Sequence, residues 1–440
     1  MKKIICLLAL FLAKISFAQK GELNEYSYQC ADGKQRPFVL YTPQNSDKAK
    51  LPLLVFLHGA VSSPQLKNAL DYARKSPFLK MADEAEFAIL FPYGNKGAGW
   101  FDEVGSAMVL GEIAEAQKKI KIDKDKIFLS GFSDGGSGVQ LFSVLFPDSF
   151  AGFISLNGSF KIAEKLSAQP LFPENMNAKP MLIFNTTKDF LYPLSQMQPI
   201  ADYLKTFNPN IEFITPEGAH DPSYLPQYEE KIINFIRSTT QSPQTALSWE
   251  SNTENTGIGW IKIKKINTQE QPQDWHKPYS LRVFNNKADL GLLYDNTYKG
   301  KGLKVYGFKN ERSEAPKMGV QIGDIILKME NHEMSSPFSQ MYYFATKQAG
   351  EPTSLSIQRG DKTLTLNGKL NEGYYYQIFE KPVNSAKVKA HISGKTLIIS
   401  TSKTSDIEID YSQIPRKIKW VELNGKRLKA TTKNTSITLN

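Results

Sequence analysis

Short apolar runs alternate with amphipathic segments between residues 37 and 237. The continuous apolar runs at 53–57 and 87–91 are each followed closely by Gly or Pro, which is typical of central strands buried on both faces. Residues 107–119 instead repeat apolar side chains three or four positions apart, which predicts a helix with one buried face. This alternation predicts an α/β architecture over residues 19–240, with helices on both faces of a mostly parallel, doubly wound sheet.

The pattern changes after about residue 240, where helical periodicity mostly gives way to short strands separated by turn residues. Residues 242–245 (Ser-Pro-Gln-Thr) have the composition of a linker. Residues 279–370 form one unit in our interpretation. The flanking segments, 245–278 and 371–440, are expected to form a small all-β domain of the sandwich type, with that unit inserted between its two halves.

The N-terminus predicts a signal peptide over residues 1–18, because two lysines precede a short apolar run and small residues stand at positions 16 and 18. We therefore expect export to the periplasm or the medium. Removal of Lys2, Lys3 and Lys14 lowers the formal net charge from +10 to +7 (10 minus 3). The remaining lysines are scattered, so no nucleic-acid partner is expected.

The sequence contains neither a long apolar stretch nor a pair of cysteines outside the signal segment. No stretch reaches the roughly 18 apolar residues that a membrane-spanning helix needs, so no stable membrane insertion is expected. Cys30 is the one cysteine outside the signal segment, which excludes an internal disulfide and a cysteine-based zinc site. We expect neither a metal nor a cofactor.

The candidate nucleophile is Ser133, in the motif Gly-Phe-Ser-Asp-Gly at residues 131–135. The motif follows the strand-like segment 126–130 and opens a helical one. A sharp turn from strand to helix requires small neighbours and presents the serine hydroxyl at the top of the sheet. The helix N-terminus there favours the negative charge that develops during acyl transfer.

A serine hydroxyl needs a base, and the expected chain order in this fold is Ser, then an acid, then His. Of the five histidines, His58 precedes the serine and three lie after residue 240, which leaves His220 as the general base. The orienting acid is expected after the strand at 181–184, where Asp189 stands. Asp221, next to the base, is the alternative acid, and an aspartate in a simple turn is the alternative role for Asp189.

Backbone N–H groups must hold the oxyanion. The residue after the nucleophile, Asp134, is expected to supply one, and Ala60, in the loop after the strand at 53–57, the other. Trp100 and Tyr192 lie in loops expected to line the acyl pocket. Either side chain could stack on a substrate or could simply pack.

Together these segments resemble the exported polyhydroxybutyrate-depolymerase-like and feruloyl-esterase-like α/β-hydrolases, a group that grades into prolyl-oligopeptidase-type sequences. The resemblance rests on residues 57–59, 92–94, Trp100, 122–136, 146–152, Asp189, Pro193 and 218–220. It implies hydrolysis of carboxylic esters through an acyl-enzyme, without a metal or cofactor. Ala60 stands where the family often has a cysteine, so the disulfide bracing of some relatives is absent.

Residues 279–370 resemble a PDZ domain, most clearly over 313–326. The resemblance implies that Leu290, Gly291 and Leu292 form a loop whose backbone N–H groups bind the C-terminal carboxylate of a peptide. The alternative is a PDZ fold that serves as a spacer or as an arm over the active site.

We interpret the sequence as an exported serine esterase acting on ester-decorated polymers or their fragments. One alternative is a serine peptidase, since the fold supports both chemistries and a PDZ unit suggests a peptide partner. Another is a non-catalytic scaffold that binds peptides through the PDZ unit.

Overall fold

The computed structural model describes residues 20–440 except 45–49, 62–67, 381–382, 431–434 and 439–440. The predicted signal peptide, residues 1–18, lies outside the described residues.

The N-terminal half is built around an eight-stranded sheet with the order β1-β2-β4-β3-β5-β6-β7-β8. β1 and β2 pair antiparallel, as do β2 and β4, whereas all pairs from β4 through β3 to β8 are parallel. This order is that of the α/β-hydrolase fold, so the predicted fold is confirmed for this half. The strands are β1 (Glu22–Gln29), β2 (Gln35–Thr42), β3 (Leu51–Leu57), β4 (Ala88–Pro92), β5 (Ile122–Phe132), β6 (Gly152–Leu156), β7 (Met181–Phe184) and β8 (Ile211–Ile214).

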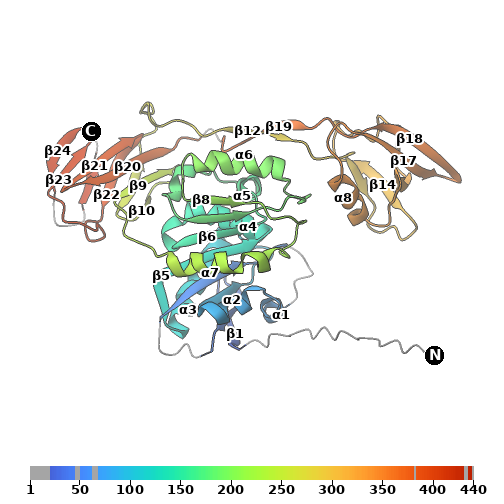
Figure 1. Ribbon diagram of the computed structural model, residues 1–440. Coiled ribbons are helices and arrows are strands. Elements are labelled where there is room, and N and C mark those ends of the chain that lie inside the picture. Colours follow the sequence, from blue (N-terminus) through green and yellow to red (C-terminus); the bar gives the residue numbers. More distant parts are fainter. Residues whose placement is uncertain (1–19, 45–49, 62–67, 381–382, 431–434, 439–440) are drawn as a thin grey trace, which may run out of the picture.

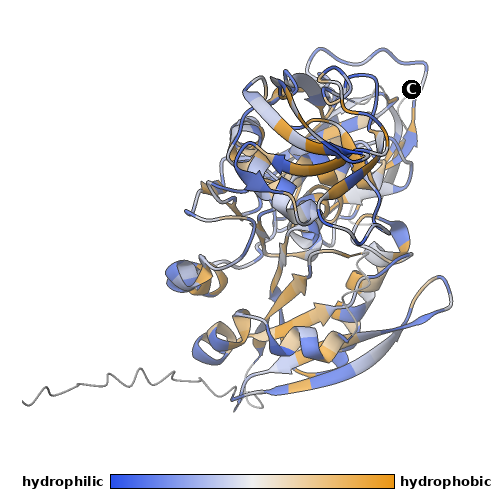
Figure 2. Ribbon diagram, turned by 90° about the vertical axis from the view of Figure 1, so that its right-hand side faces the viewer, coloured by the Kyte–Doolittle hydropathy of each residue, from blue (hydrophilic) through white to orange (hydrophobic). Residues whose placement is uncertain are grey.

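Helices cover both faces of this sheet and create two separate cores (Figure 1). Along β3, Val55 faces one core and Leu54 and Phe56 face the other, because successive side chains of a strand point to opposite faces. One face carries α3 (Glu103–Lys119), α4 (Asp134–Leu145), α5 (Phe160–Ser167) and α6 (Leu194–Lys205), and the other carries α1 (Ala69–Arg74), α2 (Phe78–Ala85) and α7 (Glu229–Ser238). In Figure 2 the strands of this sheet are mostly orange and the helices carry blue outer surfaces.

Two further sheets pack together at the C-terminal end of the chain around a shared core that includes Trp249, Ile263, Val388 and Ile399. Their strand orders are β10-β11-β22-β25 and β24-β23-β21-β20-β9. The strands come from two separate parts of the sequence. They are β9 (Ala246–Ser251), β10 (Thr256–Ile258), β11 (Ile261–Ile266), β20 (Ala386–Ser393), β21 (Thr396–Ser402), β22 (Thr404–Ile409), β23 (Trp420–Leu423), β24 (Lys426–Lys429) and β25 (Thr435–Thr438).

Between these parts the chain crosses the hydrolase domain as a two-stranded ribbon of β12 (Leu281–Asn285) and β19 (Tyr374–Ile378). Phe379, at the end of the ribbon, stacks on Tyr203 of α6 with ring centroids 5.7 Å apart. The ribbon therefore rests on the hydrolase domain and joins the all-β sheets to the unit at the right of Figure 1.

We call that unit the inserted unit, residues 286–373. It has its own core, which includes Leu290, Val305, Ile326 and Leu355. Its elements are β13 (Leu292–Tyr294), β14 (Leu303–Phe308), β15 (Ile325–Met329), β16 (His332–Glu333), α8 (Pro337–Ala345), β17 (Pro352–Arg359) and β18 (Lys362–Lys369).

Candidate active site

Ser133 stands at a sharp turn between β5 and α4, with the unusual backbone angles φ 58° and ψ −115°. The neighbouring glycines are required by space. A Cβ on Gly135 would lie 1.9 Å from the carbonyl oxygen of Leu57, and one on Gly131 would lie 2.5 Å from the backbone of Gly135. The strained turn is thus held by close backbone contacts that no other residue type would permit.

Three predicted residues meet at this turn although they are far apart in the sequence. The Ser133 hydroxyl lies 2.8 Å from Nε2 of His220, and Nδ1–H of His220 donates to Oδ2 of Asp189 over 2.7 Å. His220 lies in the loop after β8, and Asp189 in the loop after β7. The Asp189 side chain is almost fully buried, so its carboxylate can fix the tautomer of His220 and stabilise its charged form.

Both oxygens of the Asp189 carboxylate accept hydrogen bonds. Oδ1 accepts from the backbone N–H groups of Leu191 and Tyr192, at 2.8 and 2.9 Å, while Oδ2 also accepts from the side-chain amide of Asn157 at 2.8 Å. The alternative acid, Asp221, instead accepts from the backbone N–H of Ser223 at 2.9 Å. The structure therefore places Asp189, and not Asp221, against the imidazole.

Asn157 and Thr186 support this carboxylate, and neither was predicted from the sequence. Asn157 directly follows β6. Its amide nitrogen also donates to the hydroxyl of Thr186 over 2.8 Å, and its amide oxygen accepts from the hydroxyl of Tyr224 over 2.9 Å. The Thr186 hydroxyl in turn donates to the carbonyl of Ala219, beside His220, over 2.6 Å. The one signal in the sequence was the position of Asn157 at the carboxyl end of a buried strand, where side chains of neighbouring loops converge.

The predicted oxyanion loop lies beside the serine. Ala60 has a positive φ of 52°, and a Cβ on the preceding Gly59 would lie 3.1 Å from Cβ of Ser133. The carboxylate of Asp134 accepts from the backbone N–H of Val61 at 3.1 Å, which ties this loop to the start of α4. The backbone N–H groups of Ala60 and Asp134 thus belong to the two segments that flank the nucleophile.

Trp100 does not contribute a surface to the site. Its side chain is 0% exposed, and its indole N–H donates to the carbonyl oxygen of His58 over 2.8 Å. The buried Trp100 side chain therefore cannot make the predicted contact with a substrate. It instead supports the oxyanion loop through this hydrogen bond. His58 likewise donates from Nδ1 to the carbonyl of Gly59, at 2.8 Å, and is buried.

Tyr192 lies beside His220, the predicted general base. Its ring packs edge-on against His220 with centroids 5.3 Å apart. Burial raises the pKa of Tyr192 to about 12, although hydrogen bonding to Ser137 and Ser133 acts in the opposite direction. The phenol is therefore neutral at physiological pH and adjoins the position of an attacking serine.

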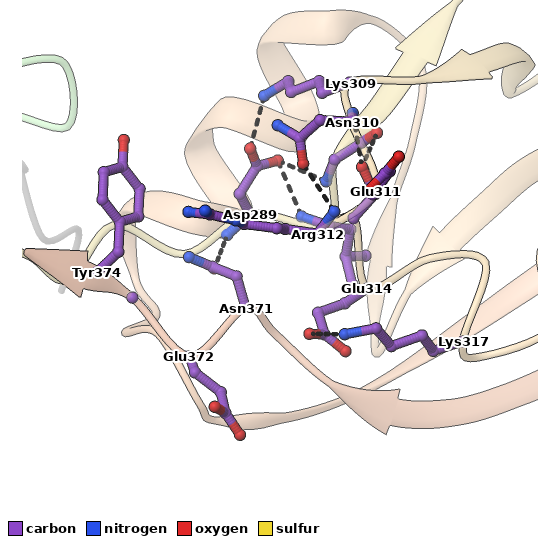
Figure 3. A pocket seen from close by; sticks show the side chains of 14 residues that line it. Asp289, Lys309, Asn310, Glu311, Arg312, Glu314, Lys317, Asn371, Glu372 and Tyr374 are labelled. Atoms are coloured by element: carbon purple, nitrogen blue, oxygen red, sulfur yellow. Dashed lines mark hydrogen bonds and ion pairs between the residues drawn. The ribbon is translucent and has the colours of Figure 1, made fainter.

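The loop predicted to bind a peptide carboxylate already holds a carboxylate of the chain itself (Figure 3). The N–H groups of Leu290 and Gly291 both donate to Oδ1 of Asp289, at 2.8 and 2.9 Å, and Oδ2 of Asp289 pairs with Lys309 at 2.6 Å. Leu292 begins β13 with its side chain buried. A peptide carboxylate would first have to displace Asp289.

Among the described residues, no group of three or more His, Cys, Asp or Glu side chains could hold a metal ion. No helix of the described residues has the length and apolar character needed to span a bilayer.

Comparison with known proteins finds similarity to esterases over part of the chain. A family model described as phospholipase/carboxylesterase matches residues 105–240. A bifunctional acetylxylan esterase/xylanase of Neocallimastix patriciarum is 24% identical over 205 residues, which are 44% of this chain and 29% of that protein. The match therefore spans less than a third of that relative.

Solved structures with a similar fold include a fluorophosphonate-binding serine hydrolase of Staphylococcus aureus. It is 21% identical with a TM-score of 0.40, and the match covers 49% of this chain and 98% of that protein. A ferulic acid esterase is 15% identical with a TM-score of 0.42, and the match again covers 49% of this chain and 98% of that protein.

The sheet order is that of the α/β-hydrolase fold, and residues 105–240 match the phospholipase/carboxylesterase family model. Over this part the chain is thus similar to hydrolases of the carboxylesterase type.

Proposed function

We propose that Ser133, His220 and Asp189 form the catalytic triad of an esterase. The observation that carries this proposal is the continuous chain of hydrogen bonds from the serine hydroxyl through the imidazole to a buried carboxylate, at 2.8 and 2.7 Å. The strained turn that presents Ser133 supports the same assignment.

In this mechanism Ser133 Oγ attacks the ester carbonyl while His220 Nε2 takes the hydroxyl proton. The N–H groups of Ala60 and Asp134 stabilise the oxyanion of the tetrahedral intermediate. His220 then gives its proton to the leaving alcohol, which leaves an acyl group on the serine. Water, activated by the same imidazole, attacks the acyl-enzyme and releases the acid.

The test is covalent labelling by a fluorophosphonate together with turnover of p-nitrophenyl acetate, in the full chain and in Ser133→Ala. We expect the wild type to be labelled and active, and the variant to lose both properties while it keeps the wild-type melting temperature. An unlabelled, inactive wild type would favour the non-catalytic scaffold. Cleavage of peptide amides with kcat/KM similar to that for esters would favour the peptidase.

For the substrate, we propose acyl groups on a polymer or on its fragments, outside the cytoplasm. The matched relative is named for deacetylation of xylan, and residues 1–18 have the pattern of an export signal. A panel of acetyl, feruloyl and hydroxybutyryl esters would identify the acyl group, and fractionation of the native host would test export.

We also propose that the chain comprises a hydrolase domain over 19–240, a PDZ-like domain over 279–370 and a sandwich formed by 245–278 with 371–440. Separate cores support the three units, while four residues in or next to the ribbon pack into the core of the hydrolase domain, namely Tyr279, Val283, Ile378 and Phe379. Limited proteolysis should release fragments with ends near these boundaries, and cleavage concentrated inside the regions would contradict it.

A further inference from the structure

A cavity of about 590 Å³ lies between the inserted unit and the loop that carries Asp189. The hydrolase side contributes Asp189, Phe190 and Leu191, and the inserted unit contributes Lys287, Gln340 and Phe344. This volume is in the range of sites that bind a sugar or an aromatic acid.

The side chain of Phe190 lines the cavity and also contacts the ring of His220, the proposed catalytic base. The ring of Phe190 lies 6.5 Å from that of His220 and 6.3 Å from that of Tyr342, on α8 of the inserted unit. Phe190 thus links the cavity to His220, the group that must protonate the leaving alcohol.

Several charged groups around the cavity have a partner of opposite charge. Asp289 pairs with Lys309 at 2.6 Å, and Lys188 pairs with Glu217 at 2.7 Å. Lys347 pairs with Glu330 at 2.9 Å. These groups contribute little net charge to the cavity.

Lys287 is different. Its ammonium group donates to the carbonyl oxygen of Leu191 over 3.3 Å, and it forms no ion pair with any acid among the described residues. The side chain is half-buried, and burial lowers its pKa. The carboxylates of Asp189 and Asp289 act in the opposite direction, but neither forms an ion pair with this ammonium group. A partly buried ammonium group that lines a cavity without a paired acid is a candidate anion site.

A second lysine reinforces this positive charge. Lys161, at the start of α5, lies 3.4 Å above the ring of Tyr376 on the ribbon and also forms no ion pair with an acid of the described chain. Its pKa is lowered to about 8, mainly by burial and in part by the ammonium groups of Lys287 and Lys165. These two half-buried ammonium groups, of Lys161 and Lys287, therefore repel each other.

We infer that this cavity binds a carboxylate on the alcohol part of an ester substrate, with Lys287 contacting the anion and Lys161 strengthening the local positive charge. This inference rests on the proposed esterase function. The substrate class is an acylated alcohol that itself carries an acid group, such as a uronic acid or a hydroxy acid.

The experiment compares two acetate esters that differ in this one charge, 4-acetoxybenzoate and the neutral 4-acetoxybenzamide, on the full-length protein. Lys287→Met should lower kcat/KM for the benzoate about 10- to 100-fold, mainly through KM, since a hydrogen bond to a charged group has about this effect. For the benzamide the change should stay within about twofold. Lys287→Arg should keep the preference for the benzoate.

The control is Lys328→Met, which removes an exposed lysine from β15 of the inserted unit and should change neither ester. Lys161→Met should lower kcat/KM for the benzoate a few-fold at low salt and less at high salt, because salt screens a partly exposed charge. Equal losses on both esters in Lys287→Met would show that Lys287 only positions the catalytic loop.

Those equal losses, or no loss on either ester, would overturn the inference while leaving the esterase function intact. A wild type that hydrolyses neither ester and takes no fluorophosphonate would instead contradict the proposed function itself, and with it the inference.

Discussion

Replacement of Asp189 by asparagine tests the hydrogen bonding around the catalytic carboxylate. The two oxygens of Asp189 accept four hydrogen bonds, from Leu191, Tyr192, His220 and Asn157. An asparagine has one oxygen and one NH₂ group, so in either orientation two of these donors face another donor. With the amide nitrogen toward His220, the imidazole must adopt the wrong tautomer and can no longer accept the serine proton.

We expect Asp189→Asn to lower kcat on the order of 10³- to 10⁴-fold, the effect of a wrong tautomer in triads of this kind. The unfolding free energy should also fall by about 1–3 kcal/mol, since two buried donors lose their acceptor. Turnover of p-nitrophenyl acetate and urea denaturation measure the two effects.

The matched control is Asp221→Asn, which changes the acid next to His220 in the sequence and should alter kcat less than about threefold. The reasoning is refuted if Asp189→Asn keeps more than about a tenth of the wild-type kcat, or if Asp221→Asn has the larger effect.

Three further changes test other parts of the hydrolase domain. Glu112 is 0% exposed, and burial raises its pKa well above the ordinary range, so it is neutral when folded and ionises on unfolding. The wild-type melting temperature should therefore fall relative to that of Glu112→Gln as pH rises from 5 to 8, and parallel curves would contradict this. Trp100→Phe removes the hydrogen bond to the carbonyl of His58 and should lower the unfolding free energy by about 1 kcal/mol. It should also lower kcat more than it changes KM, and unchanged kinetics would argue against a supporting role of Trp100. Gly135→Ala should abolish fluorophosphonate labelling, because its Cβ would overlap the carbonyl of Leu57.

The parts of this protein that the sequence predicted depend on local patterns. Apolar runs locate the central strands, and the small residues around Ser133 identify the turn, because each needs only neighbours in the sequence. Chain order then selected His220 and Asp189, and the structure brings both side chains to the serine.

What the sequence did not reveal depends on where side chains point after folding. Trp100 follows a glycine-rich loop and could equally face solvent, and only its hydrogen bond to His58 shows that it is buried. Asp289 reads as an ordinary residue two positions before Gly291, yet its carboxylate occupies the N–H groups of the next two residues. Asn157 gains its role through Tyr224, which is 67 residues away.

The ribbon gives the inserted unit an unusual attachment, since the chain enters and leaves it at adjacent points. Asn285 and Tyr374 are directly paired across β12 and β19. Residues 286–373 can therefore be excised and replaced by a two-residue hairpin turn without stretching the backbone on either side. No simple C-terminal truncation can achieve this, because the strands from β20 onward would be lost with the unit and their partner β9 would be left with an open edge.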